Sequence, residues 1–175
     1  MMTMHSGTRR STLAGAALIG LLLVTPRAHT EEGDKAALAA ALSKISTTLE
    51  NGLQASEKTG KPISAKFEIE DGKLQLSIYT VTADGFTEVV VSPETGNVAS
   101  SEKITDADDL KAATSQKAAM DKTSTSLLAA VQRVLQQNAG ARAVSIYPEL
   151  KDSQPVAAVT VLGNGQFRTV SEKLS

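Results

Sequence analysis

Apolar residues between Asp34 and Thr59 recur at intervals of three and four positions. They are Leu38, Leu42, Ile45, Leu49 and Leu53. This spacing gathers them on one face of an α-helix. We therefore expect a single amphipathic helix over residues 34–59. Asp34 is its expected N-cap, and Gly60 supplies the left-handed residue that commonly ends a helix.

The period changes from helical to two after Gly60. Apolar and polar residues alternate over residues 65–70 and again over 74–79, which predicts two strands that each have one buried face. Asp71-Gly72 between them favours a tight hairpin, and Asp84-Gly85 marks the turn into a third strand over residues 86–91. Residues 97–104 are polar and predict a short edge strand. The first half is thus expected to be a helix followed by an antiparallel meander.

The second half repeats this order. Residues 105–138 have a helical pattern that the polar stretch 121–125 interrupts, so we expect one long helix or two helices that meet there. Strands are then predicted by the alternating segments 143–147, 155–162 and 166–170.

Landmarks of the two halves lie at nearly constant offsets. Gly60 and Gly140 are 80 positions apart, and Phe86 and Phe167 are 81 apart. The predicted fold class is therefore α+β, with two tandem helix-plus-antiparallel-sheet modules joined by a long helical segment. The first module covers residues 31–104, and the linking helix with the second module covers residues 105–175.

A family resemblance rests on the first of these modules. The segment Ile63-Ser64-Ala65-Lys66-Phe67-Glu68, the hairpin Asp71-Gly72, the strand Leu76–Tyr79 and the turn Pro93-Glu94-Thr95-Gly96 resemble the PepSY family. The second copy, residues 127–174, lacks the Pro-x-Thr-Gly turn. The resemblance implies a helix packed on a small, cystatin-like antiparallel sheet. It also implies an exported protein that restrains or modulates peptidases by binding, with no catalytic residues.

The N-terminal segment has the features of an export signal. Arg9 and Arg10 precede an apolar run over residues 13–24, which is shorter than the roughly 20 residues that span a bilayer. We interpret residues 1–30 as a signal peptide that is cut near residues 28–30. The mature protein is then periplasmic or secreted, without a membrane anchor. The two arginines leave both the Sec and the Tat export routes open.

The composition excludes several kinds of chemistry. The chain has no cysteine, and its two histidines, His5 and His29, lie in the predicted signal peptide. A thiol nucleophile, a Ser-His-Asp triad and a histidine-bound zinc are therefore excluded from residues 31–175. Removing three of the 18 basic residues with the signal leaves 15 against 19 acidic residues, a net charge of −4. This charge argues against nucleic-acid binding, and no cofactor is expected.

Two motifs suggest chemistry but have simpler explanations. Glu102 with the acidic residues Asp106, Asp108 and Asp109 could supply oxygen ligands to calcium. However, acidic residues also favour the first turn of a helix, which begins near Thr105. The S-x-x-K spacing of Ser100 and Lys103 falls in the predicted edge strand, whereas in serine acyl-enzymes the serine opens a helix.

The residues predicted to make contacts with a partner lie on strands. Tyr79 occupies the polar side of its strand, so its ring is a candidate for an exposed contact. Ser100 and Lys103 belong to the expected edge strand, which could pair with an extended peptide. The other aromatic residues also fall in predicted strands, where core packing explains them.

These observations favour a non-catalytic periplasmic binding module. Its partner is an unidentified periplasmic protein or peptide, and the family resemblance extends this to a peptidase modulator or inhibitor. The alternative is a small-ligand carrier or sensor that uses a groove between the helices and sheets. An enzyme that uses carboxylates or lysine is a third hypothesis.

Overall fold

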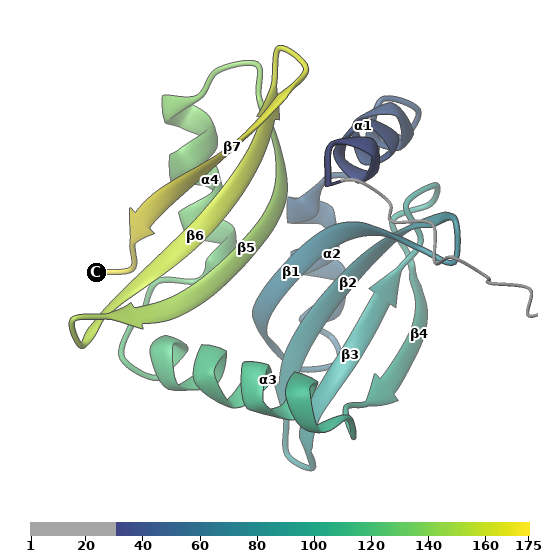
Figure 1. Ribbon diagram of the computed structural model, residues 1–175. Coiled ribbons are helices and arrows are strands. Elements are labelled where there is room, and N and C mark those ends of the chain that lie inside the picture. The colour runs from purple at the N-terminus through teal and green to yellow at the C-terminus, as the bar shows by residue number, and fades with distance from the viewer. Residues whose placement is uncertain (1–30) are drawn as a thin grey trace, which may run out of the picture.

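The computed structural model describes residues 31–175, which form one antiparallel sheet with helices on both faces (Figure 1). The predicted signal peptide lies outside the described residues. In chain order the elements are α1 (Glu31–Leu42), α2 (Leu49–Ser56), β1 (Lys61–Glu70), β2 (Lys73–Thr82), β3 (Gly85–Val91), β4 (Val98–Lys103), α3 (Ala107–Met120), α4 (Leu127–Gln137), β5 (Arg142–Lys151), β6 (Gln154–Gly163) and β7 (Gln166–Lys173).

The expectation of two modules joined by a long helix is wrong. All seven strands belong to one sheet in the order β4-β3-β2-β1-β5-β6-β7, and the linking segment is two helices, α3 and α4. The first strand of each meander has an open edge with unpaired backbone groups. Pairing β1 with β5 satisfies these groups and merges the two halves.

A repeat persists inside the merged sheet. Lys61 and Arg142 begin the first strands of the two halves, and Lys73 and Gln154 begin the second strands, an offset of 81 residues in both cases. Ala65 and Ile146 have the same offset, and they are paired with one another. A residue that pairs with its own counterpart in an antiparallel ladder marks a local two-fold axis perpendicular to the sheet. The two halves are related by this axis.

The prediction of one continuous helix over residues 34–59 is also wrong. The structure has two helices, α1 and α2, separated by a break at residues 43–48. The break contains the β-branched residues Ile45, Thr47 and Thr48, which favour a helix less than unbranched residues do. Thr48 then starts α2 with a capping box. Its hydroxyl accepts from the Asn51 backbone N–H at 3.2 Å, and the Asn51 side chain accepts from the Thr48 N–H at 2.9 Å.

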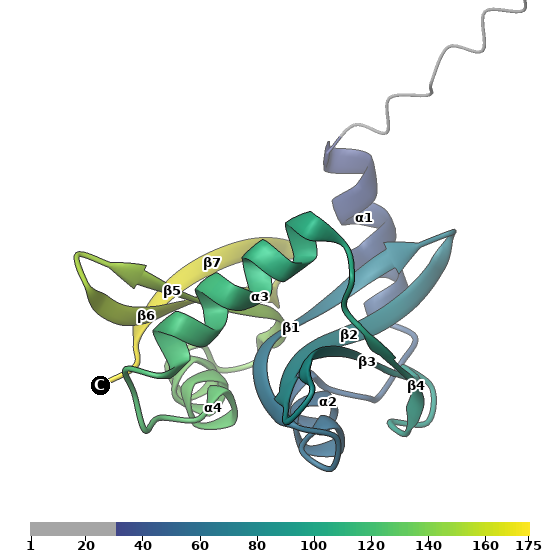
Figure 2. The same ribbon diagram turned by 90° about the horizontal axis from the view of Figure 1, so that it is seen from below.

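The two faces of the sheet differ. We call the side that carries Ala65, Ile146 and Val159 the core face, and the side that carries Lys66, Ser145 and Thr160 the groove face. Helices α2 and α4 cover the core face, and α3 lies along the groove face (Figure 2). Helix α1 stands at the end of the junction between β1 and β5 and reaches from the groove face towards the core, where Leu42 is buried. The largest fully buried side chains of the core include Leu49, Leu53, Leu76, Ile78, Ile146, Val89, Val91 and Val131.

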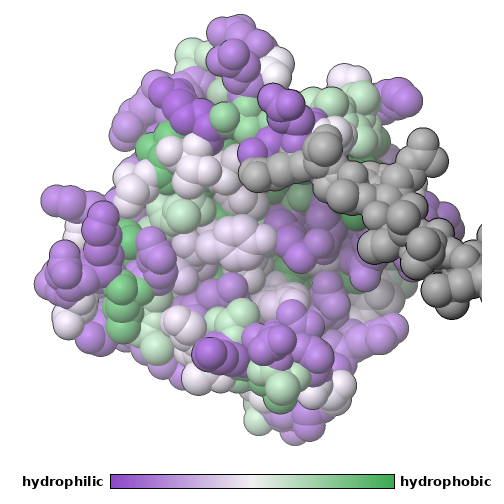
Figure 3. All heavy atoms as spheres, viewed as in Figure 1, coloured by the Kyte–Doolittle hydropathy of each residue, from purple (hydrophilic) through white to green (hydrophobic). Residues whose placement is uncertain are grey.

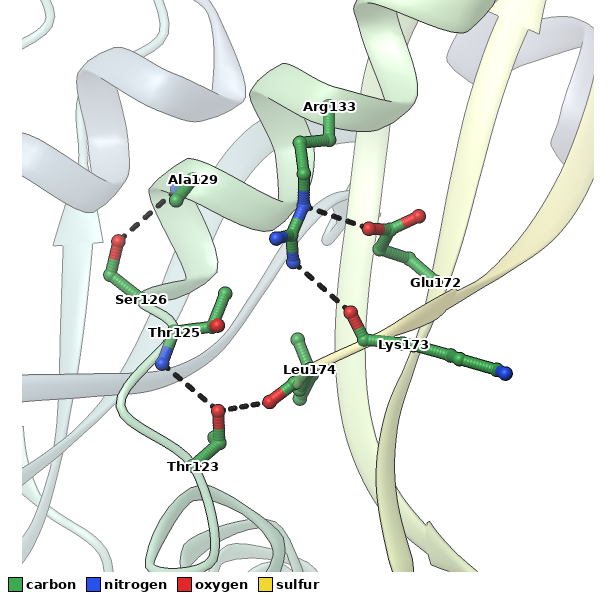
Figure 4. A network of polar contacts seen from close by, with 8 residues as sticks. All are labelled: Thr123, Thr125, Ser126, Ala129, Arg133, Glu172, Lys173 and Leu174. Atoms are coloured by element: carbon green, nitrogen blue, oxygen red, sulfur yellow. Dashed lines mark hydrogen bonds and ion pairs between the residues drawn. The ribbon is translucent and has the colours of Figure 1, made fainter.

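Polar contacts fix the C-terminal end of the chain against α4 (Figure 4). Arg133 forms an ion pair with Glu172 at 2.8 Å and donates to the Lys173 carbonyl oxygen at 3.0 Å. The Thr123 hydroxyl, in the connection between α3 and α4, donates to the Leu174 carbonyl oxygen. Because Leu174 is also fully buried, these contacts hold β7 in place as the edge strand of the second half.

Gly60 lies where only a glycine fits, which yields a test of the packing. A Cβ atom at this position would lie 2.5 Å from the Val81 carbonyl oxygen, a backbone atom that cannot rotate away. We expect Gly60→Ala to lower the free energy of unfolding by roughly 1–3 kcal/mol, as overpacking of a well-packed site does. Urea denaturation measures this change.

The matched control is Gly163→Ala. There the new Cβ would lie 3.3 Å from the Ala141 Cβ, so a small shift relieves the contact. We expect a clearly smaller loss of stability. Equal effects of the two substitutions would contradict the close approach of Gly60 to β2.

Candidate functional site

Three adjoining hollows form a groove that follows the groove face and continues around α1, where Phe67 and Ile69 of the core face line it. One hollow of about 570 Å³ lies between α1 and the β1–β2 hairpin. The second, of about 300 Å³, lies between α1 and strands β5 to β7 and shares Lys35, Leu38 and Phe67 with the first. The third, of about 170 Å³, lies under α3 and shares Lys66 and Tyr147 with the second. The hollows therefore follow one another across the junction of β1 and β5.

The floor of this groove is polar. Figure 3 shows this side of the molecule, with pale and hydrophilic residues over much of its centre. Residues that face one another on neighbouring strands form a row across the sheet. The row contains hydroxyls or lysine at every position except a single valine: Thr169, Thr160, Ser145, Lys66, Ser77, Val90 and Ser100.

Apolar side chains line the groove beside this floor. Leu38 of α1 and Phe67 of β1 line the first two hollows, and Val144 and Phe167 line the second. The groove thus combines apolar side walls with hydroxyl groups, an arrangement typical of sites that bind molecules with both kinds of surface.

Arg142 fixes the position of α1, which forms one wall. Its guanidinium donates to the carbonyl oxygens of Leu42 at 2.9 Å, Ile45 at 3.0 Å and Thr47. The guanidinium carbon also lies 5.5 Å from the centre of the Phe67 ring. Burial lowers the pKa of Arg142, although an arginine remains charged at any physiological pH. One side chain of the second half therefore holds the end of the first helix.

The hollow under α3 is the most polar part of the groove. The Tyr79 hydroxyl donates to Asp109 Oδ1 of α3 at 2.7 Å. Ser64 and Ser77 lie at its floor and are both buried. Gln116 of α3 reaches in from the opposite wall. We call this hollow the α3 pocket.

Charged groups at the α3 pocket influence one another. Burial lowers the pKa of the Lys66 ammonium, but the hydrogen bond and the charge of Glu68, 2.5 Å away, outweigh burial and raise it. Burial raises the pKa of Glu88, against a hydrogen bond from Ser77 that lowers it. Burial also raises the pKa of Tyr147, against the nearby Lys66 charge that lowers it. Lys66 therefore stays a cation at neutral pH and Tyr147 stays uncharged.

The residues predicted to make contacts are not brought together. Tyr79 is half-buried and lines the α3 pocket, so it does not stand free on the surface. Ser100 lies on the groove face of β4, at the far end of the row that contains Lys66. Lys103 pairs with Thr87, in phase with the core face, at the exposed end of β4. Three components of the groove, Lys66, Tyr147 and Gln116, were missed by the sequence analysis.

The acidic residues near the start of α3 serve the helix. The Asp106 carboxylate accepts from the backbone N–H groups of Asp108 at 2.9 Å and Asp109 at 3.1 Å. Asp106 is therefore the N-cap of α3. Within the described part of the chain, no three His, Cys, Asp or Glu side chains gather closely enough to hold a metal ion.

No family model matches the chain, and no curated protein or solved structure matches it. The resemblance to the PepSY family therefore stays a prediction. Among residues 31–175, no helix has the length and hydropathy needed to cross a bilayer.

The contact between Tyr79 and Asp109 can be tested by titration. Burial, the hydrogen bond to Asp109 and its charge raise the pKa of Tyr79 well above its ordinary value of about 10. The chain has two tyrosines, so in a Tyr147→Phe background the absorbance of the phenolate reports Tyr79 alone. We expect a midpoint above the ordinary value, and a lower midpoint when Asp109→Asn is added.

The same shift has a consequence for stability. The phenol of Tyr79 has a higher pKa in the folded than in the unfolded state, so its protonated form stabilises the fold. This stabilisation is fully present below the unfolded pKa of about 10, and it is lost as the pH rises towards the folded pKa. The free energy of unfolding of Tyr79→Phe should therefore fall less than that of the unmodified protein as the pH rises above about 10. A midpoint near the ordinary value, unmoved by Asp109→Asn, would contradict the contact.

Proposed function

We propose that this protein is an exported, non-catalytic binding protein whose groove holds an extended peptide segment of a partner. The observation that carries the proposal is the groove at the β1–β5 junction, where hydroxyl groups form the floor and apolar side chains line the sides. Peptide backbones offer donors and acceptors to hydroxyls, and apolar walls accept alternate side chains.

The volume of the groove supports an extended occupant. The two larger hollows, of about 570 and 300 Å³, are each in the range of ligand sites and are joined through shared residues. The groove also crosses the strands of the sheet rather than following one edge. A segment of several residues could therefore occupy successive hollows.

The ionisable groups in the groove favour binding over catalysis. A general base or nucleophile works best with a pKa near the operating pH. The pKa values of Lys66, Tyr79 and Tyr147, which line the α3 pocket, are instead raised further from neutrality. Burial raises the pKa of Glu88, but this residue does not line the pocket. Residues 31–175 also contain no histidine or cysteine.

The location and the partner rest on the sequence. The signal-like segment of residues 1–30 supports a periplasmic or secreted protein. The resemblance to the PepSY family supports a peptidase as the partner that supplies the bound segment. The small-ligand alternative would use the α3 pocket alone, since this is the most enclosed polar hollow of the three.

A direct test measures peptide binding to two surface variants. A library of short, unstructured peptides is screened for binding to the purified protein by fluorescence anisotropy. Thr160→Arg places a long charged side chain on the groove floor, where Thr160 contacts Thr169 at 3.0 Å. We expect this variant to weaken the affinity of the selected peptides about tenfold or more, which corresponds to about 1.4 kcal/mol.

Ser101→Arg is the matched control. It makes the same change in charge on exposed Ser101 of β4, in phase with the core face. Circular dichroism checks that both variants fold. The proposal fails if no peptide binds the unmodified protein, or if Ser101→Arg weakens binding as much as Thr160→Arg does.

A further inference from the structure

Gln116 is buried with an unsatisfied polar atom. Gln116 is 8% exposed, and it is one of the few buried polar residues in the described part of the chain. Its side-chain Oε1 is fully enclosed and has no hydrogen-bond partner. An unpaired buried acceptor is costly, so a glutamine at this position requires a reason. The side chain lines the α3 pocket, which suggests that the reason is a bound group.

The pocket that Gln116 lines carries charges of both signs. The Asp109 carboxylate lies on the α3 side, where it accepts from Tyr79. The Lys66 ammonium lies on the β1 side, where it also forms an ion pair with Glu68 at 2.5 Å. The remaining polar groups are hydroxyls and the Gln116 amide, which can act as donors or acceptors. An occupant therefore meets acceptors at one wall and donors at the other.

We propose that the α3 pocket is a subsite for an uncharged carboxamide, the side chain of a glutamine or asparagine in the bound segment. A rotation about the last side-chain torsion of Gln116, which is broad, would turn Oε1, enclosed in the free protein, towards the N–H groups of the carboxamide. The Asp109 side of the pocket would accept from them as well. The carbonyl oxygen of the carboxamide would face Lys66. This inference rests on the proposed peptide-binding function and adds the class of side chain that the groove selects.

Charge and size both favour this occupant over its isosteres. A carboxylate would lie against Asp109 and offer no donor to Gln116 Oε1. An ammonium would lie against Lys66 and offer no acceptor. A carboxamide has both groups and no charge. The pocket volume of about 170 Å³ is close to that of an engineered cavity of about 150 Å³ that binds benzene, so a side chain of this size fits.

The first experiment tests the pocket without a peptide. The probes are propionamide, propionate and propylammonium, which have similar shapes and differ in charge and hydrogen-bonding groups. Each is titrated at millimolar concentrations into the isotope-labelled protein, and the side-chain amide signal of Gln116 is followed by NMR. We expect a saturable shift with propionamide. The two charged probes should bind at least about tenfold more weakly, since each leaves one hydrogen bond unmade and adds a repulsion.

Gln116→Leu is the variant that decides the role of the glutamine. It removes the unpaired acceptor, so the free protein should keep or gain thermal stability, while the binding of propionamide, read from the backbone amides around the pocket, should be lost. Ser115→Leu is the control, because Ser115 is exposed on the same helix and its substitution should leave binding unchanged. Equal binding of the three probes, or unchanged binding of propionamide by Gln116→Leu, would overturn the proposal.

A second experiment separates this inference from the proposed function. In a peptide that binds the groove, replacing its glutamine or asparagine with glutamate should weaken binding about tenfold in the unmodified protein and much less in Gln116→Leu. If propionamide binds and no peptide does, the subsite stands and the peptide function fails. If peptides bind without any preference for a carboxamide, the peptide function stands and the subsite fails.

Discussion

Two backbone pairs, Ala65 with Ile146 and Lys66 with Ser145, join the halves of the sheet, and the shape of the groove depends on this short ladder. Strands β1 and β5 are ten residues long each, so they diverge on both sides of the paired residues. The connection 43–48, held by Arg142, lies near one diverging end. Residues Ser126 to Leu128 lie beside Lys61 and Pro62 near the other. Helices α1 and α3 thereby come to lie on either side of the junction, and the space between them is the groove.

Local pattern predicted the strands and the turns of this sheet but not the way in which they are assembled. Alternation of apolar and polar residues located β1, β2, β3 and β6, and Asp71-Gly72 adopts the positive φ values that a tight hairpin needs. The break between α1 and α2 was missed because Arg142, which binds the carbonyls there, lies about a hundred positions along the chain. Gly52 lies inside α2, where a glycine normally weakens the helix. Its presence is explained by a distant contact, since a Cβ there would lie 2.4 Å from the Leu76 side chain. The merging of the two halves likewise depends on contacts between residues distant in sequence.

The candidate site was predictable only in part, for a related reason. The polar side of an alternating strand is normally the side in contact with water, and that assumption directed attention to Tyr79 as an exposed ring. Here α3 packs over β1 and β5 on the polar side, so Ser64, Ser77 and Ser145 are buried although their pattern predicts exposure. Burial turns these hydroxyls, together with Lys66 and Gln116, from an ordinary polar surface into the lining of a groove. Ser100 and Lys103, on the outermost strand, remain outside it.

The most direct test of the account is the position of a bound peptide relative to the sheet. Isotope-filtered NMR of labelled protein with an unlabelled peptide records which protein protons lie next to the ligand. The account predicts contacts to Lys66, Tyr147 and Thr160, which surround the β1–β5 junction on the groove face. Contacts to the outer edges of β4 or β7, or to the surfaces of α2 and α4, would contradict it, because the peptide would then bind away from the junction on which the groove depends.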